Sequence, residues 1–201
     1  MTLGKRGSLP MAVAVAGGLL AGLAARAPAQ PLDPARVLGP QACRDCHKSA
    51  SMAWERTRHF ASRTALDAPA AARIRDALGI RESAEVAAQC AGCHVTAKQE
   101  DGRRRVVAGV SCESCHGAAA GWIKVHANYG SGRTKATETA DHRDERLGES
   151  MAAGMLRPEN VYRVVQNCYA CHTVPDESLV NKGGHRAGSP IELVAWSQGA
   201  V

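Results

Sequence analysis

Aromatic side chains are scarce in this chain of 201 residues. Phenylalanine, tryptophan and tyrosine together make up 3% of it, as one Phe, three Trp and three Tyr. Aromatic residues supply much of the buried area in an ordinary globular core. Protein side chains alone would therefore form a poor core, and we expect something else to contribute to the interior.

Long hydrophobic runs are absent after the first 25 residues. Residues 1–29 have the three parts of a secretory signal: a basic start at Lys5 and Arg6, an apolar stretch, and small residues for cleavage after Ala29. An uncleaved membrane anchor is the alternative, but the many glycines and alanines make the stretch weakly hydrophobic. We expect a soluble, periplasmic mature domain spanning residues 30–201.

The net charge of +6 gives little support for nucleic acid binding. Three basic residues lie in the leader, which leaves 22 basic and 19 acidic residues in the mature chain. These are scattered, apart from the run at 103–105, Arg-Arg-Arg. We interpret this run as a solvated loop, with a docking patch for an acidic partner as the alternative. No nucleic acid partner is expected.

All eight cysteines lie in C-x-x-C pairs, and each pair is followed at once by a histidine. Successive motifs are 47, 22 and 56 residues apart, which excludes a regular repeat. The four motifs are Cys43-Arg44-Asp45-Cys46-His47, Cys90-Ala91-Gly92-Cys93-His94, Cys112-Glu113-Ser114-Cys115-His116 and Cys168-Tyr169-Ala170-Cys171-His172.

This motif is typical of covalent haem attachment in exported proteins. The two thiols form thioethers to one porphyrin, and the histidine becomes the proximal iron ligand. One helical turn places residues i, i+3 and i+4 on a common face, so a local element can hold the ring and reach its metal. The sequence predicts four haem c groups, bound by Cys43, Cys46, Cys90, Cys93, Cys112, Cys115, Cys168 and Cys171, with proximal ligands His47, His94, His116 and His172.

Three other readings of the cysteine pairs are weaker. A zinc site needs no histidine directly after each pair. A disulfide across two residues closes too small a loop to stabilise much. A thioredoxin-like redox pair would occur once, within an α/β pattern that this sequence lacks.

The four remaining histidines equal the predicted haems in number, which suggests one distal ligand for each iron. A lone histidine is otherwise more often a surface or hydrogen-bonded residue. Met52, Met151 and Met155 are alternative axial ligands, although methionine at helical spacing more often serves packing. The candidate distal ligands are His59, His126, His185 and His142.

Hydrophobic spacing and turn residues predict a mainly α fold: a compact multihaem cytochrome with short helices around four haems and one small β-hairpin. The hairpin is expected within 95–110, around Asp101-Gly102. Helices are expected at 49–66, 69–78, 118–129 and 143–155, from Pro158 into the fourth motif, and from Ser189-Pro190 through Trp196.

Three segments resemble the tetrahaem cytochrome c-554 family: CRDCHKSASMAWERTRHFA at 43–61, CAGCHV at 90–95 and GVSCESCHG at 109–117. The resemblance implies a helical electron carrier with stacked haem pairs. It also implies three irons held by two histidines each and a five-coordinate iron at the second motif. Carried over, His59 would ligate the third haem and His126 the first. The C-terminal third departs from the family pattern, so His142 could serve the second haem, the fourth or none.

The function expected from these features is electron transfer between redox partners, such as cytochromes and quinol-oxidising or terminal reductase complexes. We expect membrane contact only through a partner or an uncleaved leader. The alternatives are an enzyme acting on a small nitrogen compound at a five-coordinate haem, and a haem-bearing sensor or subunit of a larger redox complex. The equal numbers of spare histidines and haems argue against an enzyme.

Overall fold

The computed structural model describes residues 32–83, 87–188 and 190–191, together with Met1. Two predicted features, the signal sequence at 1–29 and the last helix at 189–196, lie outside the described residues except at a few positions. Both stay predictions.

Short helices dominate the described part of the chain, and one antiparallel hairpin accompanies them, so the mainly α prediction is confirmed. In chain order the elements are α1 Gln41–Arg44, α2 Lys48–Trp54, the 3₁₀ helix η1 Phe60–Asp67, α3 Pro69–Leu78, α4 Ala88–His94, β1 Thr96–Glu100, β2 Arg103–Ala108, α5 Cys112–His116, the 3₁₀ helix η2 Ala119–Gly121, α6 Ile123–His126, α7 Ala140–Ala152, α8 Val161–His172 and α9 Glu177–Asn181.

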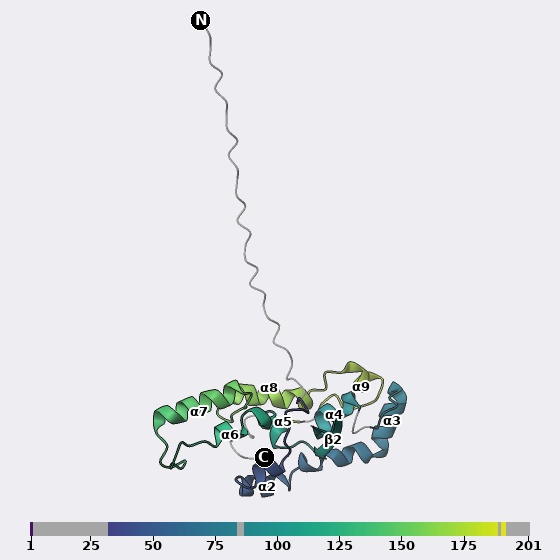
Figure 1. Ribbon diagram of the computed structural model, residues 1–201. Coiled ribbons are helices and arrows are strands. Elements are labelled where there is room, and N and C mark those ends of the chain that lie inside the picture. The colour runs from purple at the N-terminus through teal and green to yellow at the C-terminus, as the bar shows by residue number, and fades with distance from the viewer. Residues whose placement is uncertain (2–31, 84–86, 189, 192–201) are drawn as a thin grey trace.

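Helices α7 and α8 follow one another along one long side of the molecule (Figure 1). Helix α6 packs against α7, while α4 and α5 both contact α8. At the other end α3 packs against η1 and α9. The elements that carry the second, third and fourth motifs therefore meet around α8.

Each of the four motifs forms a helical turn. Helices α4, α5 and α8 end at the motif histidines His94, His116 and His172. The first motif begins in the last residues of α1 and ends just before α2, and its His47 amide donates to the Cys43 carbonyl oxygen at 2.9 Å. In all four, the i, i+3 and i+4 side chains share one face, as haem attachment requires.

The helix predicted at 49–66 is wrong in its middle, because α2 ends at Trp54 and a 3₁₀ helix begins only at Phe60. Thr57 Oγ1 donates to the Trp54 carbonyl oxygen at 2.7 Å and accepts from the Phe60 amide at 3.2 Å. A threonine that bonds nearby backbone groups competes with the regular helical ladder. The indole of Trp54 also donates to the Val110 carbonyl oxygen at 2.8 Å, which fixes the end of α2 against the segment after the hairpin.

The hairpin prediction is confirmed. Strands β1 and β2 pair from Glu100–Arg103 to Thr96–Ala108. The two turn residues, Asp101 and Gly102, have φ values of 49° and 74°. Positive φ at both positions gives the turn whose twist matches the flanking strands, and Asp-Gly is a favoured pair there.

The other predicted helices differ mainly at their ends. The helix at 69–78 has the predicted bounds, and Gly79 ends it in the left-handed region at φ 69°. The helix predicted from Pro158 into the fourth motif begins only at Val161. It begins there because the Asn160 side chain caps it by accepting from the Arg163 amide.

Two further segments differ more. The stretch at 118–129 is split into η2 and α6. The helix predicted at 143–155 instead runs from Ala140 to Ala152.

Helix α9 was not predicted from the sequence. Asp176 caps it by accepting from the Ser178 and Leu179 amides.

Side chains bury only a small apolar core in the described residues. Its main cluster consists of Leu66, Ala91 and Val95, with Cys90 and Val106 packed against it. Two members of this group lie in the second motif, so the core is built around an attachment site. Among the described residues, no helix has the length and hydrophobicity needed to cross a bilayer.

Candidate functional site

Three pairs of histidine rings face each other at nearly equal separations. Two imidazoles that share one metal through bonds of about 2 Å have ring centroids roughly 6 Å apart. Each pair joins a motif histidine to one outside the motifs. The centroid distances are 6.3 Å for His47 and His126, 6.0 Å for His59 and His172, and 6.3 Å for His94 and His185.

The pairs differ in the angle between their ring planes. The rings of His47 and His126 are inclined by 20°, so they are nearly parallel. The other two pairs are closer to perpendicular. The angle between the ring planes is 89° for His59 and His172, and 73° for His94 and His185. On a bound iron, these angles would give the first pair a ligand field distinct from the other two.

Hydrogen bonds to Nδ1 fix the orientation of several candidate ligands. The distance from Nδ1 to a carbonyl oxygen is 2.6 Å in His126, 2.7 Å in His185, 3.0 Å in His116 and 3.2 Å in His94. Metal-binding histidines commonly donate one ring N–H to such an acceptor, which leaves the other nitrogen free for the metal. Nε2 is therefore the available ligand atom in all four.

Burial lowers the pKa of two candidate ligands, His59 and His94. Desolvation lowers the pKa of His59, and the nearby His172 lowers it further. Desolvation likewise lowers the pKa of His94, with a smaller opposing effect from the Ser62 carbonyl and a further lowering by His185. Only the neutral imidazole can bind a metal, so both shifts favour the ligand form.

The pairing departs from the family resemblance at two motifs. His59 lies opposite His172 of the fourth motif, whereas the resemblance implied the third. His94 of the second motif faces His185, whereas the resemblance implied an iron without a second histidine there. His126 does lie opposite His47, as the resemblance implied for the first haem.

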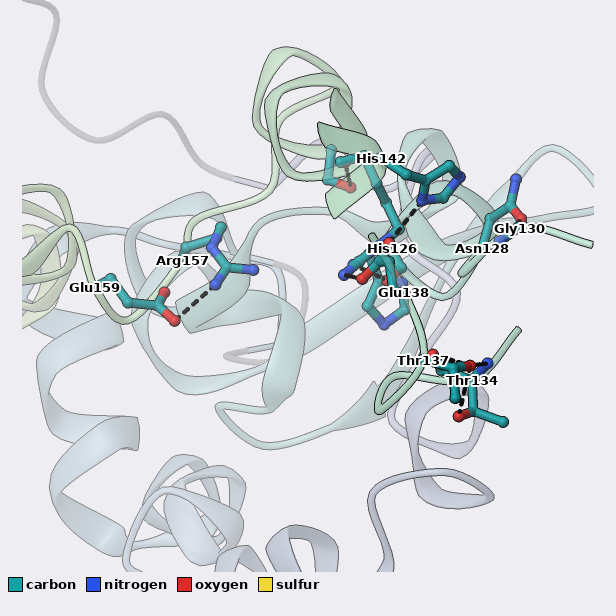
Figure 2. Close-up of polar contacts among 11 residues, drawn as sticks. His126, Asn128, Gly130, Thr134, Thr137, Glu138, His142, Arg157 and Glu159 are labelled. Atoms are coloured by element: carbon teal, nitrogen blue, oxygen red, sulfur yellow. Dashed lines mark hydrogen bonds and ion pairs between the residues drawn. The ribbon is translucent and has the colours of Figure 1, made fainter. Parts of the chain in front are cut away.

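His142 has a different environment. Its Nδ1 lies 2.7 Å from Glu138 Oε1, and Arg146 holds both carboxylate oxygens of Glu138 at 2.7 and 2.6 Å, as Figure 2 shows for the His142–Glu138 contact. Arg146 also donates to the His126 carbonyl oxygen at 2.6 Å. Among the described residues, neither His142 nor His116 has a ring contact with another histidine, so the structure brings no histidine opposite the third motif.

The cysteines of different motifs lie close together. The Cys43 and Cys112 thiols interact with each other, which raises the pKa of Cys43 and lowers that of Cys112 to about 7. The Cys93 and Cys171 thiols interact in the same way, which lowers the pKa of Cys93 to about 7. The first motif therefore touches the third, and the second touches the fourth.

The third and fourth motifs are neighbours too. The Asn167 amide group donates to the Ser114 carbonyl oxygen at 2.6 Å and to that of Cys115 at 3.3 Å. Burial raises the pKa of Cys115 to about 11, and the nearby Cys168 contributes to this. These contacts arrange the motifs in the spatial order first, third, fourth, second.

Sequence reasoning missed three residues that shape the site. Trp54 and Glu113 each bond backbone far away in the sequence, and no local signal could have shown this. The Glu138 contact had no helical signal either, because Glu138 lies before α7 begins at Ala140, although it is only four residues from His142.

The residues fit covalently bound haem, because each attachment turn brings two cysteines and a histidine together, and three of the motif histidines lie at single-iron spacing from a second histidine ring. No group of three or more His, Cys, Asp or Glu side chains in the described part of the chain is arranged to hold a bare metal ion. The ligand role of each histidine stays a prediction.

Comparison with known proteins gives two matches. The model of the family "Cytochrome c554 and c-prime" matches residues 42–117, which include the first three motifs. Cytochrome c-554 of Nitrosomonas europaea is 24% identical over 146 residues, covering 67% of this chain and 56% of the relative. The chain thus spans little more than half the length of that relative. No solved structure matches the chain. The match over residues 42–117 and the distant relative support a multihaem c-type cytochrome similar to cytochrome c-554, a kind of protein in which haem c is bound covalently.

Proposed function

We propose that the protein is a periplasmic tetrahaem cytochrome that passes electrons between redox partners. The observation that carries the proposal is the set of three histidine pairs at single-iron spacing, each including one motif histidine. Haem iron, when bound, supplies a one-electron couple whose potential depends on its axial ligands and surroundings.

The chain contributes positioning and rigidity. Backbone acceptors hold the imidazoles of His126 and His185 at fixed orientations, with Nε2 free. A pair of such histidines on one iron keeps its coordination the same in both oxidation states, so little has to reorganise when an electron moves. Cysteines on each helical turn would keep the porphyrin attached in a chain with a small core.

The spatial order of the motifs supports transfer through the molecule. The Cys43–Cys112 and Cys93–Cys171 contacts join motifs that are far apart in sequence, and Asn167 joins the third motif to the fourth. An electron path would therefore run first, third, fourth, second. The first and second motifs form its two ends, which makes them the natural docking points for a donor and an acceptor.

The location and partners follow from the cofactor and the leader. Residues 1–29 have the pattern of a secretory signal, and haem c is attached after export. The partners we propose are other redox proteins, including cytochromes and quinol-oxidising or terminal reductase complexes, which would dock through small, transient interfaces.

A second candidate function is the binding of a small molecule at the third haem. It is favoured by His116, whose Nδ1 is held by the Leu156 carbonyl oxygen at 3.0 Å while no histidine ring lies opposite it in the described residues. An iron with a free position could bind nitric oxide or carbon monoxide. The open position would then lie at the third motif, and the carrier function does not depend on it.

Intact mass and a pyridine haemochrome assay test the proposed cofactor content. The protein matured in a host with haem-attachment machinery should carry four covalent haems, and replacing both Cys112 and Cys115 with alanine should leave three. Reversible reduction by a soluble donor and oxidation by an acceptor should follow. Protein that matures with unmodified thiols would refute the proposal.

Carbon monoxide separates the two candidates. Binding of one equivalent to the reduced protein, lost in the variant with Cys112→Ala and Cys115→Ala that lacks the third haem, supports an open third haem. Absence of any binding would contradict the open third haem.

A further inference from the structure

Glu113 is the most deeply buried charged residue in the described part of the chain. Its side chain has no solvent exposure, and it lies inside the third attachment motif, directly after Cys112. A buried carboxylate is costly unless hydrogen bonds compensate for the lost water. The groups that surround the carboxylate therefore indicate the role of its charge.

Three backbone amides compensate the carboxylate. Oε1 accepts from Leu38 N at 3.0 Å and from Ala119 N at 2.8 Å, and Oε2 accepts from Gly39 N at 2.7 Å. All three partners are donors, so the group is bonded as an acceptor-only carboxylate. Two successive N–H groups aimed at one anion form a concave binding site of the kind that backbone makes for anions.

Two of these amides come from the segment that leads into the first motif. Leu38 and Gly39 lie 75 and 74 residues from Glu113 in the chain, and α1 begins at Gln41. Gly39 has φ 95°, a conformation that favours glycine and directs its N–H toward Oε2. Glu113 thus links the first and third attachment turns directly.

The negative charge lies close to both attachment sites. Its charge helps to raise the pKa of the Cys43 thiol in the first motif, and it opposes the lowering of the Cys112 pKa in the third. Those two thiols are themselves in contact. A fixed anion there would stabilise the more positive, oxidised state of each nearby iron, and screening is weak because the group is buried.

We propose that Glu113 is a positioning residue that holds the first and third haem turns together and whose charge lowers the reduction potentials of both irons. The inference rests on the proposed tetrahaem function. It adds a tuning role that the attachment motifs and the histidine ligands do not imply.

The test is a redox titration of the holoprotein, followed by electron paramagnetic resonance, which separates the irons by their signals. In Glu113→Gln the ferrous-to-ferric ratio of the first and third haems, at a fixed solution potential, should rise at least tenfold, or about 59 mV for a one-electron couple. The second and fourth haems should change less. Glu145→Gln, which removes an exposed carboxylate on α7, is the matched control and should change none of them.

Glutamine carries an N–H₂ group that would meet a donor in this site, so the variant could fail to mature. Glu113→Asp then serves as the second variant. Its shorter side chain draws the charge back toward its own backbone and away from Leu38 and Gly39. The first haem's potential should rise while the third's holds.

Haem content separates the failures of the two proposals. Wild-type protein without four haems refutes the proposed function. Four haems in Glu113→Gln with unchanged first and third potentials refute the role of Glu113. An unchanged first potential in mature Glu113→Asp refutes it as well.

Discussion

Glu138 is the residue that joins His142 to the rest of the molecule. Its side chain is only 2% exposed, and Arg146 holds both of its oxygens while His142 holds one. The hydrogen bond from Arg146, aided by His142, lowers the Glu138 pKa from its ordinary 4.5 to about 2. The carboxylate therefore stays ionised through almost all of the acid range.

This shift fixes the sign of a pH effect. A carboxyl group whose pKa is lower in the folded state adds stability above its unfolded value, and that stability is lost as pH falls through the folded value. Glu138→Gln should be less stable than the wild type at pH 6, and the difference should shrink between pH 4.5 and about 2. Thermal unfolding across this range measures it. A constant difference down to pH 2 would contradict the ion-pair assignment.

Replacing single histidines tests the ligand pairs. His185 faces His94, whereas His142 is held by Glu138 and faces no motif histidine among the described residues. His185→Ala should convert one low-spin iron to a high-spin one in electron paramagnetic resonance. His142→Ala, the matched control, should leave the low-spin signals intact; loss of one of them would make His142 a ligand after all.

The limits of sequence reasoning are clear at this scale. The attachment cysteines and proximal histidines followed from local spacing, because one helical turn defines each motif. The distal pairing did not, because His59 and His172 are 113 positions apart and meet only through the fold. Carry-over from the family placed His59 at another motif.

At the scale of elements, the hairpin and the capped helix α3 were predictable because turn glycines mark them. Asp101-Gly102 and Gly79 adopt the positive φ values that their positions suggest. The break between α2 and η1 was not predictable, because it depends on Thr57 and on the hydrogen bond from Trp54 to Val110, which is 56 residues away. Periodicity alone reads that stretch as one helix.

Gly109 is the point where the hairpin and η1 come closest. A methyl group there would lie 2.6 Å from the Phe60 carbonyl oxygen and 2.7 Å from that of His59. Gly109→Ala should therefore cost about 1–3 kcal/mol of unfolding free energy, as overpacking does. It should also move the His59 backbone and alter the spectrum of the iron that His59 is proposed to ligate.

A matched alanine substitution in α7 should raise the free energy of unfolding instead of lowering it. Gly148 lies within the helix and has open space around its Cβ position. Gly148→Ala should stabilise the protein by about 0.4–1 kcal/mol, because it restricts the unfolded chain without strain. Denaturant unfolding of both variants measures the contrast, and equal effects would show that the close approach at Gly109 is not tight.

At the scale of the whole molecule, four motifs that are irregularly spaced in sequence form a continuous row. The Cys43–Cys112 contact, the Asn167 bonds and the Cys93–Cys171 contact give the order first, third, fourth, second. The small side-chain core agrees with the scarcity of aromatic residues noted in the sequence. Composition could indicate that cofactors contribute to the interior, but not the order in which they lie.

Electron paramagnetic resonance of the oxidised holoprotein tests the central claim, that three histidine pairs each ligate one iron, together with the second proposal, that the third motif's iron is open. Nearly parallel rings split the iron orbitals and give a rhombic low-spin signal, while nearly perpendicular rings give a strongly anisotropic one. The account predicts one rhombic signal from His47 and His126, two anisotropic signals from the pairs at 73° and 89°, and one high-spin iron. Four low-spin irons, or an open iron assigned to the second motif, would contradict it.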